Sequence, residues 1–258
     1  MKKYTWIPFF LTLVIAQDNS LFFSEYAEGS SNNKYLEIYN GTGADIDLSD
    51  YSLSSCSNGC DEDNELDYPD NVTFAEGTII ADGEVYVVYH GSADAAIVAE
   101  GDQAFTYLSN GNDVFAITEA GATASSYTII DIIGEMGGDP GSGWAVAGVA
   151  DATKEHTLVR KSSITSGTTN WTVAAGTNAA DSEWIVHDQN TWSYLGSHTM
   201  TEPNLLSEGF ENGVIPENWS IINNDGHPNS WYAYGSSWYA HTGNYSARVY
   251  YNPTGSDD

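Results

Sequence analysis

The sequence predicts an all-β protein built as a β-sandwich, and three observations point to this fold class. Short segments rich in Tyr, Val, Ile and Thr recur along the chain and are separated by Gly, Asn and Asp. No long stretch repeats apolar residues at the three- and four-residue spacing of an amphipathic helix. The spacing of the strand-like segments, with turn residues between them, is typical of a sandwich.

The expected strands begin near the N-terminus. Residues 21–53 predict a strand, a short acidic break, a second strand, an Asn/Gly turn and a third strand. The strands expected over the first 160 residues are 24–26, 34–40, 46–53, 84–89, 113–118, 127–133 and 156–160. The interval 55–77 is long and acidic, so we expect it to form a loop that crosses one end of the sandwich.

The N-terminus has the pattern of a secretory signal peptide. Lys2 and Lys3 precede an apolar run of about ten residues, 6–15, and Ala16 is a suitable residue for cleavage. The alternative is a membrane anchor, but the run is shorter than the roughly 20 apolar residues that span a bilayer. We therefore expect a signal peptide at 1–16 and a secreted or cell-surface protein with no transmembrane segment after cleavage.

The chain is strongly acidic, which bears on its partners. It carries 7 basic and 36 acidic residues, a formal net charge of −29. Such a chain repels phosphate backbones and has no basic stripe, so we expect no binding to nucleic acid. The acidic excess suits a solvated surface, and it also leaves carboxylates available to hard cations such as calcium.

The sequence contains two cysteines, Cys56 and Cys60. Secretion permits a disulfide, and the three intervening residues can form a turn tight enough for one. The alternatives are free thiols or half of a metal site, although a four-thiolate zinc site needs two more cysteines. The sequence favours the disulfide.

The strand-like segments resemble a known family, the lamin-tail domain in the form found in secreted bacterial proteins. The segments that carry the resemblance are 24–26, 34–40, 46–53, 79–88, 110–116, 130–134, 157–161, 182–186 and 194–199. The resemblance covers about 21–199 and implies an immunoglobulin-like β-sandwich domain at 20–199. Such a domain is usually a binding or spacing module that accompanies another activity.

A second pattern follows a linker expected at 200–206. Its ordered pieces are Phe210-Glu211, Pro216 to Trp219, Asn224-Asp225-Gly226, Ser230-Trp231 and Gly243 to Ala247. They resemble the start of the cleaved-adhesin (choice-of-anchor J) jelly-roll family of secreted bacterial proteins. The resemblance implies a partial jelly-roll β-sandwich at 207–258, and we expect the domain to continue beyond residue 258.

Calcium is the cofactor that the second module suggests, in a structural role. Hard cations prefer several carboxylate and carbonyl oxygens on converging loops. The candidate ligands are Glu208, Glu211, Asn224, Asp225, Asp257 and Asp258. The alternative is that 223–226 forms only a tight turn. A further acidic cluster, 61–67, lacks the glycine and glutamate positions of a calcium loop, which favours a solvated loop.

The second module is also rich in aromatic residues that could contact a ligand. We expect Trp219 and Trp231 to lie in the core, and Tyr234, Trp238 and Tyr239 to be candidate ligand-binding residues. Aromatic rings exposed in this way can stack on sugar rings. The alternative is that all five belong to the core or to an ordinary surface.

The sequence shows no catalytic motif. It has no His-Glu-x-x-His pair, no Gly-x-Ser-x-Gly elbow and no Gly-rich phosphate loop with Lys. The abundant acidic residues produce carboxylate pairs by chance, so glycoside hydrolysis stays an alternative. We predict no catalytic residue in this segment.

The expected function is therefore non-catalytic adhesion or scaffolding on an extracellular glycan or protein surface. The main alternative is a pair of accessory modules in a secreted hydrolase, a nuclease or peptidase, whose catalytic domain lies beyond residue 258. A third possibility is a purely structural role in a surface layer.

Overall fold

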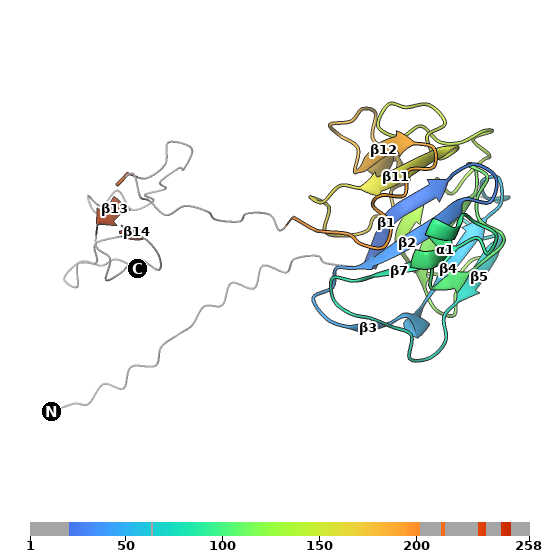
Figure 1. Ribbon diagram of the computed structural model, residues 1–258, viewed down its shortest axis with the longest axis horizontal. Helices are drawn as coiled ribbons and strands as arrows, with labels where there is room; N and C mark the ends of the chain where they lie inside the picture. Colours follow the sequence, from blue (N-terminus) through green and yellow to red (C-terminus); the bar gives the residue numbers. More distant parts are fainter. Residues whose placement is uncertain (1–20, 63, 202–212, 215–231, 236–243, 249–258) are drawn as a thin grey trace. The chain divides into compact units, whose positions relative to one another are not determined.

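The computed structural model describes residues 21–62, 64–201, 213–214, 232–235 and 244–248 (Figure 1). The chain divides into two compact units, residues 1–202 and residues 203–258. The described part of the first unit is an immunoglobulin-like β-sandwich, which confirms the predicted fold class. Within the described ranges, no helix has the length and apolar character needed to cross a membrane.

The larger sheet of the sandwich has six strands. Their order is β12 (Trp184–Asp188), β11 (His156–Arg160), β1 (Leu21–Glu28), β2 (Lys34–Asn40), β7 (Val85–Tyr89) and β8 (Gln103–Ala104). Figure 1 shows the first five of these side by side, with short α1 (Ala95–Glu100) close to β7. All neighbouring pairs are antiparallel except β7 and β8, which are parallel.

The smaller sheet has four antiparallel strands. Their order is β10 (Ile129–Ile133), β9 (Val114–Glu119), β4 (Tyr51–Cys56) and β5 (Tyr68–Thr73). A separate two-stranded ribbon pairs β3 (Ile46–Asp47) with β6 (Ile79–Ile80). The remaining elements are the 3-10 turn η1 (Leu48–Asp50) and α2 (Trp171–Ala175).

The predicted strands agree with the structure except in one interval. β2 and β11 have the expected bounds, and the expected strand 46–53 is divided by η1 into β3 and β4. The prediction that 55–77 forms only a loop is wrong, because β5 lies within it. Pro69 and Asp70 have low strand propensity, so the sequence pattern did not indicate this strand. Proline is tolerated here because β5 is an edge strand, and no further strand needs a hydrogen bond from the N–H that Pro69 lacks.

Strands β1 and β2 are buried along their whole length. An antiparallel strand with one covered face alternates between buried and exposed residues, so this pattern means that both faces of the six-stranded sheet are covered. The inner face packs on the four-stranded sheet in the main hydrophobic core. On the outer face, Tyr35 and Val87 pack with Ile97 of α1 and with Trp192 and Leu195 of residues 189–201, here called the closing segment.

A buried carboxylate links the two sheets. Strand β1 contains a β-bulge between Phe23 and Glu25. The Phe23 N–H donates to Asp131 Oδ2 of β10 at 2.8 Å, and Thr168 N–H donates to Asp131 Oδ1 at 2.8 Å. Because β1 belongs to the larger sheet and β10 to the smaller, the Asp131 carboxylate fastens one sheet to the other at the bulge.

The charge of Asp131 is balanced by a buried arginine. Arg160 Nη2 lies 3.1 Å from Asp131 Oδ1 and 3.1 Å from Glu183 Oε2, the latter without the geometry of a hydrogen bond. The guanidinium also lies over the Trp184 ring, 4.5 Å from its centroid. Burial raises the pKa of Asp131, and Arg160 and the two N–H donors oppose that rise.

The described part of the second unit is a two-stranded antiparallel ribbon. It pairs β13 (Tyr232–Gly235) with β14 (Tyr245–Arg248). The Tyr232 and Tyr234 rings meet edge to face at 6.3 Å.

The first prediction concerns the carboxylate that links the sheets. Asp131→Ala removes one of the two carboxylates beside the buried Arg160 and leaves the Phe23 and Thr168 N–H groups without their acceptor, so we expect a loss of about 3–5 kcal/mol in the free energy of unfolding. Urea denaturation of the whole chain measures this loss. The control is Asp61→Ala at an exposed position, where we expect a change within about 0.5 kcal/mol. Equal effects of the two substitutions would contradict the linking role.

Candidate functional site

A cleft opens at one end of the four-stranded sheet, where β4 ends and β9 begins. Its volume is about 370 Å³. Its walls come from the end of β4, from β5 and from the loop 105–113 that precedes β9. The side chains that give it chemical character are those of Cys56, Tyr68, Asn71, Tyr107, Asn110 and Asp113.

Two tyrosines of the cleft are exposed to solvent. Tyr107 is 79% exposed and Tyr68 is 51% exposed. Neither phenol oxygen makes a hydrogen bond to another part of the chain that the structure describes. Large aromatic side chains of this exposure, inside a concave surface, are available to contact a ligand.

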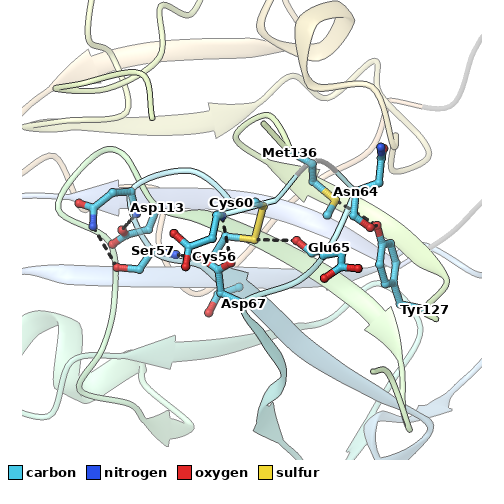
Figure 2. Close-up of a disulfide and its surroundings, with 12 residues drawn as sticks. Cys56, Ser57, Cys60, Asn64, Glu65, Asp67, Asp113, Tyr127 and Met136 are labelled. Atoms are coloured by element: carbon cyan, nitrogen blue, oxygen red, sulfur yellow. Dashed lines mark hydrogen bonds between the residues drawn. A yellow bond between two sulfur atoms is a disulfide. The ribbon is translucent and has the colours of Figure 1, made fainter. Parts of the chain in front are cut away.

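The wall next to Cys56 is fixed by a disulfide. Cys56 and Cys60 are bonded, as expected, and their Cα atoms are 4.8 Å apart. Figure 2 shows Ser57 and Asp113 on one side of this bond and Glu65, near Tyr127, on the other. Asp113 Oδ1 accepts from Asn58 N–H at 2.8 Å, which attaches the disulfide loop to the loop before β9.

Gly59 completes the turn inside the disulfide loop. Its φ is +80°, in the left-handed region. A Cβ at this position would lie 2.7 Å from the Gly137 carbonyl oxygen, so a larger side chain does not fit without a shift of the backbone. Gly59 N–H donates to Asn112 O at 2.8 Å, which again joins the disulfide loop to the loop before β9.

A buried lysine positions the other wall. Lys34 Nζ donates to Ser109 O at 2.7 Å and to Asn110 Oδ1 at 2.6 Å, and it forms an ion pair of 3.2 Å with Glu28. The side-chain oxygen of Asn110 therefore already accepts a hydrogen bond from Lys34, whereas its NH2 group remains available to donate to a ligand. On the β5 wall, Asn71 Nδ2 donates to Ser55 Oγ at 2.7 Å, which leaves the Asn71 carbonyl oxygen as a free acceptor.

The lining of the cleft favours binding over catalysis. It includes no histidine, lysine or arginine, and its one carboxylate, Asp113, accepts backbone N–H groups with both oxygens. No nucleophile therefore has a base beside it. What the cleft offers is two aromatic faces, hydroxyl groups and amide groups on a fixed frame.

Two buried carboxyl groups with raised pKa values, Glu25 of β1 and Glu37 of β2, lie outside the cleft in the six-stranded sheet. Glu25 and Glu37 are 1% and 0% exposed. Glu37 accepts from Ser24 Oγ at 2.7 Å and from Gly196 N–H at 2.6 Å, and Glu25 accepts from Tyr35 Oη at 2.8 Å. Because both are buried, this carboxyl pair is out of reach of a substrate, and Glu37 attaches the closing segment through Gly196.

Burial dominates the acidity of both groups. It raises the pKa of Glu25 to about 9, with a further contribution from the Glu37 charge. It raises the pKa of Glu37 to about 7, against the lowering effect of its Ser24 and Gly196 donors. Nearby His198 packs between Phe22 and Tyr39, and burial lowers its pKa to about 4.

The residues proposed from the sequence for metal and ligand binding belong mainly to parts that the structure does not describe. All six calcium candidates, Glu208, Glu211, Asn224, Asp225, Asp257 and Asp258, lie outside the described residues, as do Trp238 and Tyr239. Tyr234 is a partly buried residue of β13. Within the described ranges, no group of three or more His, Cys, Asp or Glu side chains could hold a metal ion. The calcium site and the aromatic ligand site thus stay predictions.

The sequence did not predict the cleft. Tyr68 and Tyr107 are far apart in the chain and meet only because β5 lies at the edge of the four-stranded sheet, near the loop that leads into β9. The one available signal was the presence of a tyrosine in each of two turn-rich, polar segments.

Comparison with known proteins found one family model that is similar to part of the chain. Residues 15–131 match the family model of the Lamin Tail Domain. The match ends within β10, whereas the sandwich continues through β11 and β12. It does not extend to residues 207–258 and gives no support to the jelly-roll resemblance. Searches of curated proteins and of solved structures found no match.

The second prediction concerns pH. Above pH 4.5 the unfolded chain releases the protons of both Glu25 and Glu37, whereas the folded chain keeps them until about pH 9 and about pH 7. The unfolded state then binds fewer protons, so the free energy of unfolding falls as pH rises from 5 to 9. Melting curves between pH 7 and 9, where His198 is neutral in both states, measure the decline. The double variant Glu25→Gln/Glu37→Gln should flatten it, and an unchanged slope would contradict this assignment.

The third prediction concerns the turn at the cleft. We expect Gly59→Ala to lower the free energy of unfolding by about 1–3 kcal/mol, because the new Cβ combines a positive φ with a close contact. The matched control is Gly77→Ala, with φ +81° and no atom within 4 Å of the added Cβ, which isolates the cost of φ alone. Urea denaturation compares the two variants, and an equal loss in both would show that the Gly137 contact does not matter.

Proposed function

We propose that this chain is a non-catalytic module of a secreted or cell-surface protein that binds or positions itself on an extracellular glycan or protein surface. The observation that carries the proposal is the fixed cleft with two exposed tyrosines, Tyr68 and Tyr107. The lamin-tail match agrees with it, because an immunoglobulin-like domain of this kind is typically non-catalytic.

The construction of the cleft supports a binding role. The disulfide, the Asp113 acceptor and the Lys34–Glu28 ion pair all hold the walls in place before any ligand arrives. A preformed site spends little conformational entropy when it binds, and this improves affinity. The nucleophile-free lining agrees with a role in attachment.

Two sequence features support an extracellular location. The first is the predicted signal peptide at 1–16, which lies outside the described residues. The second is the Cys56–Cys60 disulfide, because such bonds persist in oxidising compartments. The acidic charge of −29 suits a protein that stays soluble outside the cell and avoids nucleic acid.

A second candidate function is that of an accessory module in a secreted hydrolase. In this case the cleft holds a nuclease or peptidase near its substrate, and the catalytic domain lies beyond residue 258.

We also propose calcium as a structural ion of residues 207–258, under either of the two functions. Titration calorimetry of the whole chain with calcium tests this calcium site, and the absence of any heat of binding would count against the site.

The fourth prediction tests the cleft. The whole chain, passed over a panel of immobilised glycans and extracellular proteins, should be retained on at least one surface. The double variant Tyr68→Ala/Tyr107→Ala should lose at least about tenfold in apparent affinity for that surface, because exposed aromatic side chains dominate such contacts. The control is Tyr194→Ala, which removes a 44% exposed tyrosine from outside the cleft. Retention that the double variant does not weaken would overturn the proposal.

A further inference from the structure

We propose that the cleft binds an uncharged sugar ring of a neutral glycan, with Tyr107 and Tyr68 as the stacking side chains. This inference rests on the proposed function and names the class of ligand. It is carried by the size of the cleft, by the free groups of its walls and by the charge around it.

The size of the cleft suits a small unit of a longer chain. At about 370 Å³ it falls at the small end of ligand sites, which span roughly 300–1,000 Å³. A stable protein interface buries about 800 Å² on each partner, which is far more than two tyrosines and a few polar side chains offer. A glycan, in contrast, can place one or two rings in such a cleft while the rest of the chain remains in solvent.

The two tyrosines supply the apolar contact that a sugar ring requires. A pyranose presents C–H groups on its face, and an aromatic ring presents a negative π face to them. Tyr107 and Tyr68 keep much of their surface open to solvent. The Tyr107 ring contacts the Phe105 ring edge to face at 6.0 Å, which supports its orientation and leaves most of the side chain uncovered.

The polar groups of the walls match sugar hydroxyls. Each sugar hydroxyl can both donate and accept, so it needs a mixture of donors and acceptors opposite it. Asn110 contributes amide donors, because Lys34 already occupies its carbonyl oxygen. Asn71 contributes a carbonyl acceptor, because its amide donates to Ser55. The tyrosine hydroxyls add groups of both kinds.

The charge of the site excludes acidic glycans. The lining contains the Asp113 carboxylate and no basic side chain. Lys34, which holds the loop 105–113 from behind the lining, is buried and paired with Glu28, Ser109 and Asn110. With a net charge of −29 on the chain, uronate, sulfate and sialate groups are repelled. Neutral sugars meet no such barrier, and their binding should not depend on salt.

A glycan array probed with the whole chain tests this inference. The array contains neutral oligosaccharides of glucose, mannose, galactose, xylose and N-acetylglucosamine, beside uronate, sulfated and sialylated oligosaccharides. We expect retention on one or more neutral members, at equal strength in low and high salt. Titration calorimetry with the best soluble oligosaccharide should then show a loss of about tenfold or more for Tyr107→Ala, a smaller loss for Tyr107→Phe and no loss for Tyr194→Ala.

Three outcomes would overturn the inference. Retention on acidic glycans alone, or on a protein alone, through the tyrosines would leave the proposed function intact and make the ligand class wrong. Neutral-glycan binding that Tyr107→Ala and Tyr68→Ala both leave unchanged would place the sugar site elsewhere. No retention on any glycan or protein would reject both the ligand class and the proposed function. Circular dichroism of each variant confirms that the fold is kept.

Discussion

The sandwich depends on one buried hydrogen-bonded charge, the Asp131 carboxylate. Two β-sheets that pack only through apolar side chains can slide over each other at modest cost, because hydrophobic contact has no direction. Asp131 removes that freedom, since its Oδ2, on a strand of the smaller sheet, accepts from the Phe23 N–H of the larger sheet. Arg160 offsets the cost of burying the Asp131 charge, because the two side chains form an ion pair.

The outer layer and the cleft follow from that fixed frame. With β1 set in register by its bulge, the outer face of the six-stranded sheet presents Glu37 and Tyr35 to the closing segment, which Gly196 attaches through its N–H. The opposite consequence appears at the end of the four-stranded sheet. There β4 ends and β9 begins, and a cleft lies between the end of β4, β5 and the loop 105–113. The disulfide loop and Lys34 fix the position of the loop 105–113 through hydrogen bonds to Asp113, Asn112, Ser109 and Asn110.

Much of the fold could be predicted from the sequence, but the cleft could not. The strands that alternate or concentrate β-branched and aromatic residues, such as 34–40 and 156–160, were found with their correct bounds. Strand β5 was missed, because its pairing with β4 overrides the weak propensity of Pro69 and Asp70. Helix α1 was missed for a similar reason: it has six residues, and Ile97 is its one buried side chain. A site made by Tyr68 and Tyr107 depends on tertiary placement, for which local patterns carry no signal.

The unusual composition of β5 has a further consequence for a protein that works in crowded surroundings. An edge strand ordinarily offers a row of N–H and C=O groups to any passing chain, and this is how sheets recruit one another into fibrils. Proline at position 69 lacks an N–H, and Asp70 adopts a left-handed φ of 49° that breaks the extended line of the strand. Pro69 and Asp70, which made β5 difficult to predict from the sequence, therefore also make its free edge a poor partner for a strand of a second molecule. This disfavours self-assembly of the sheet through that edge.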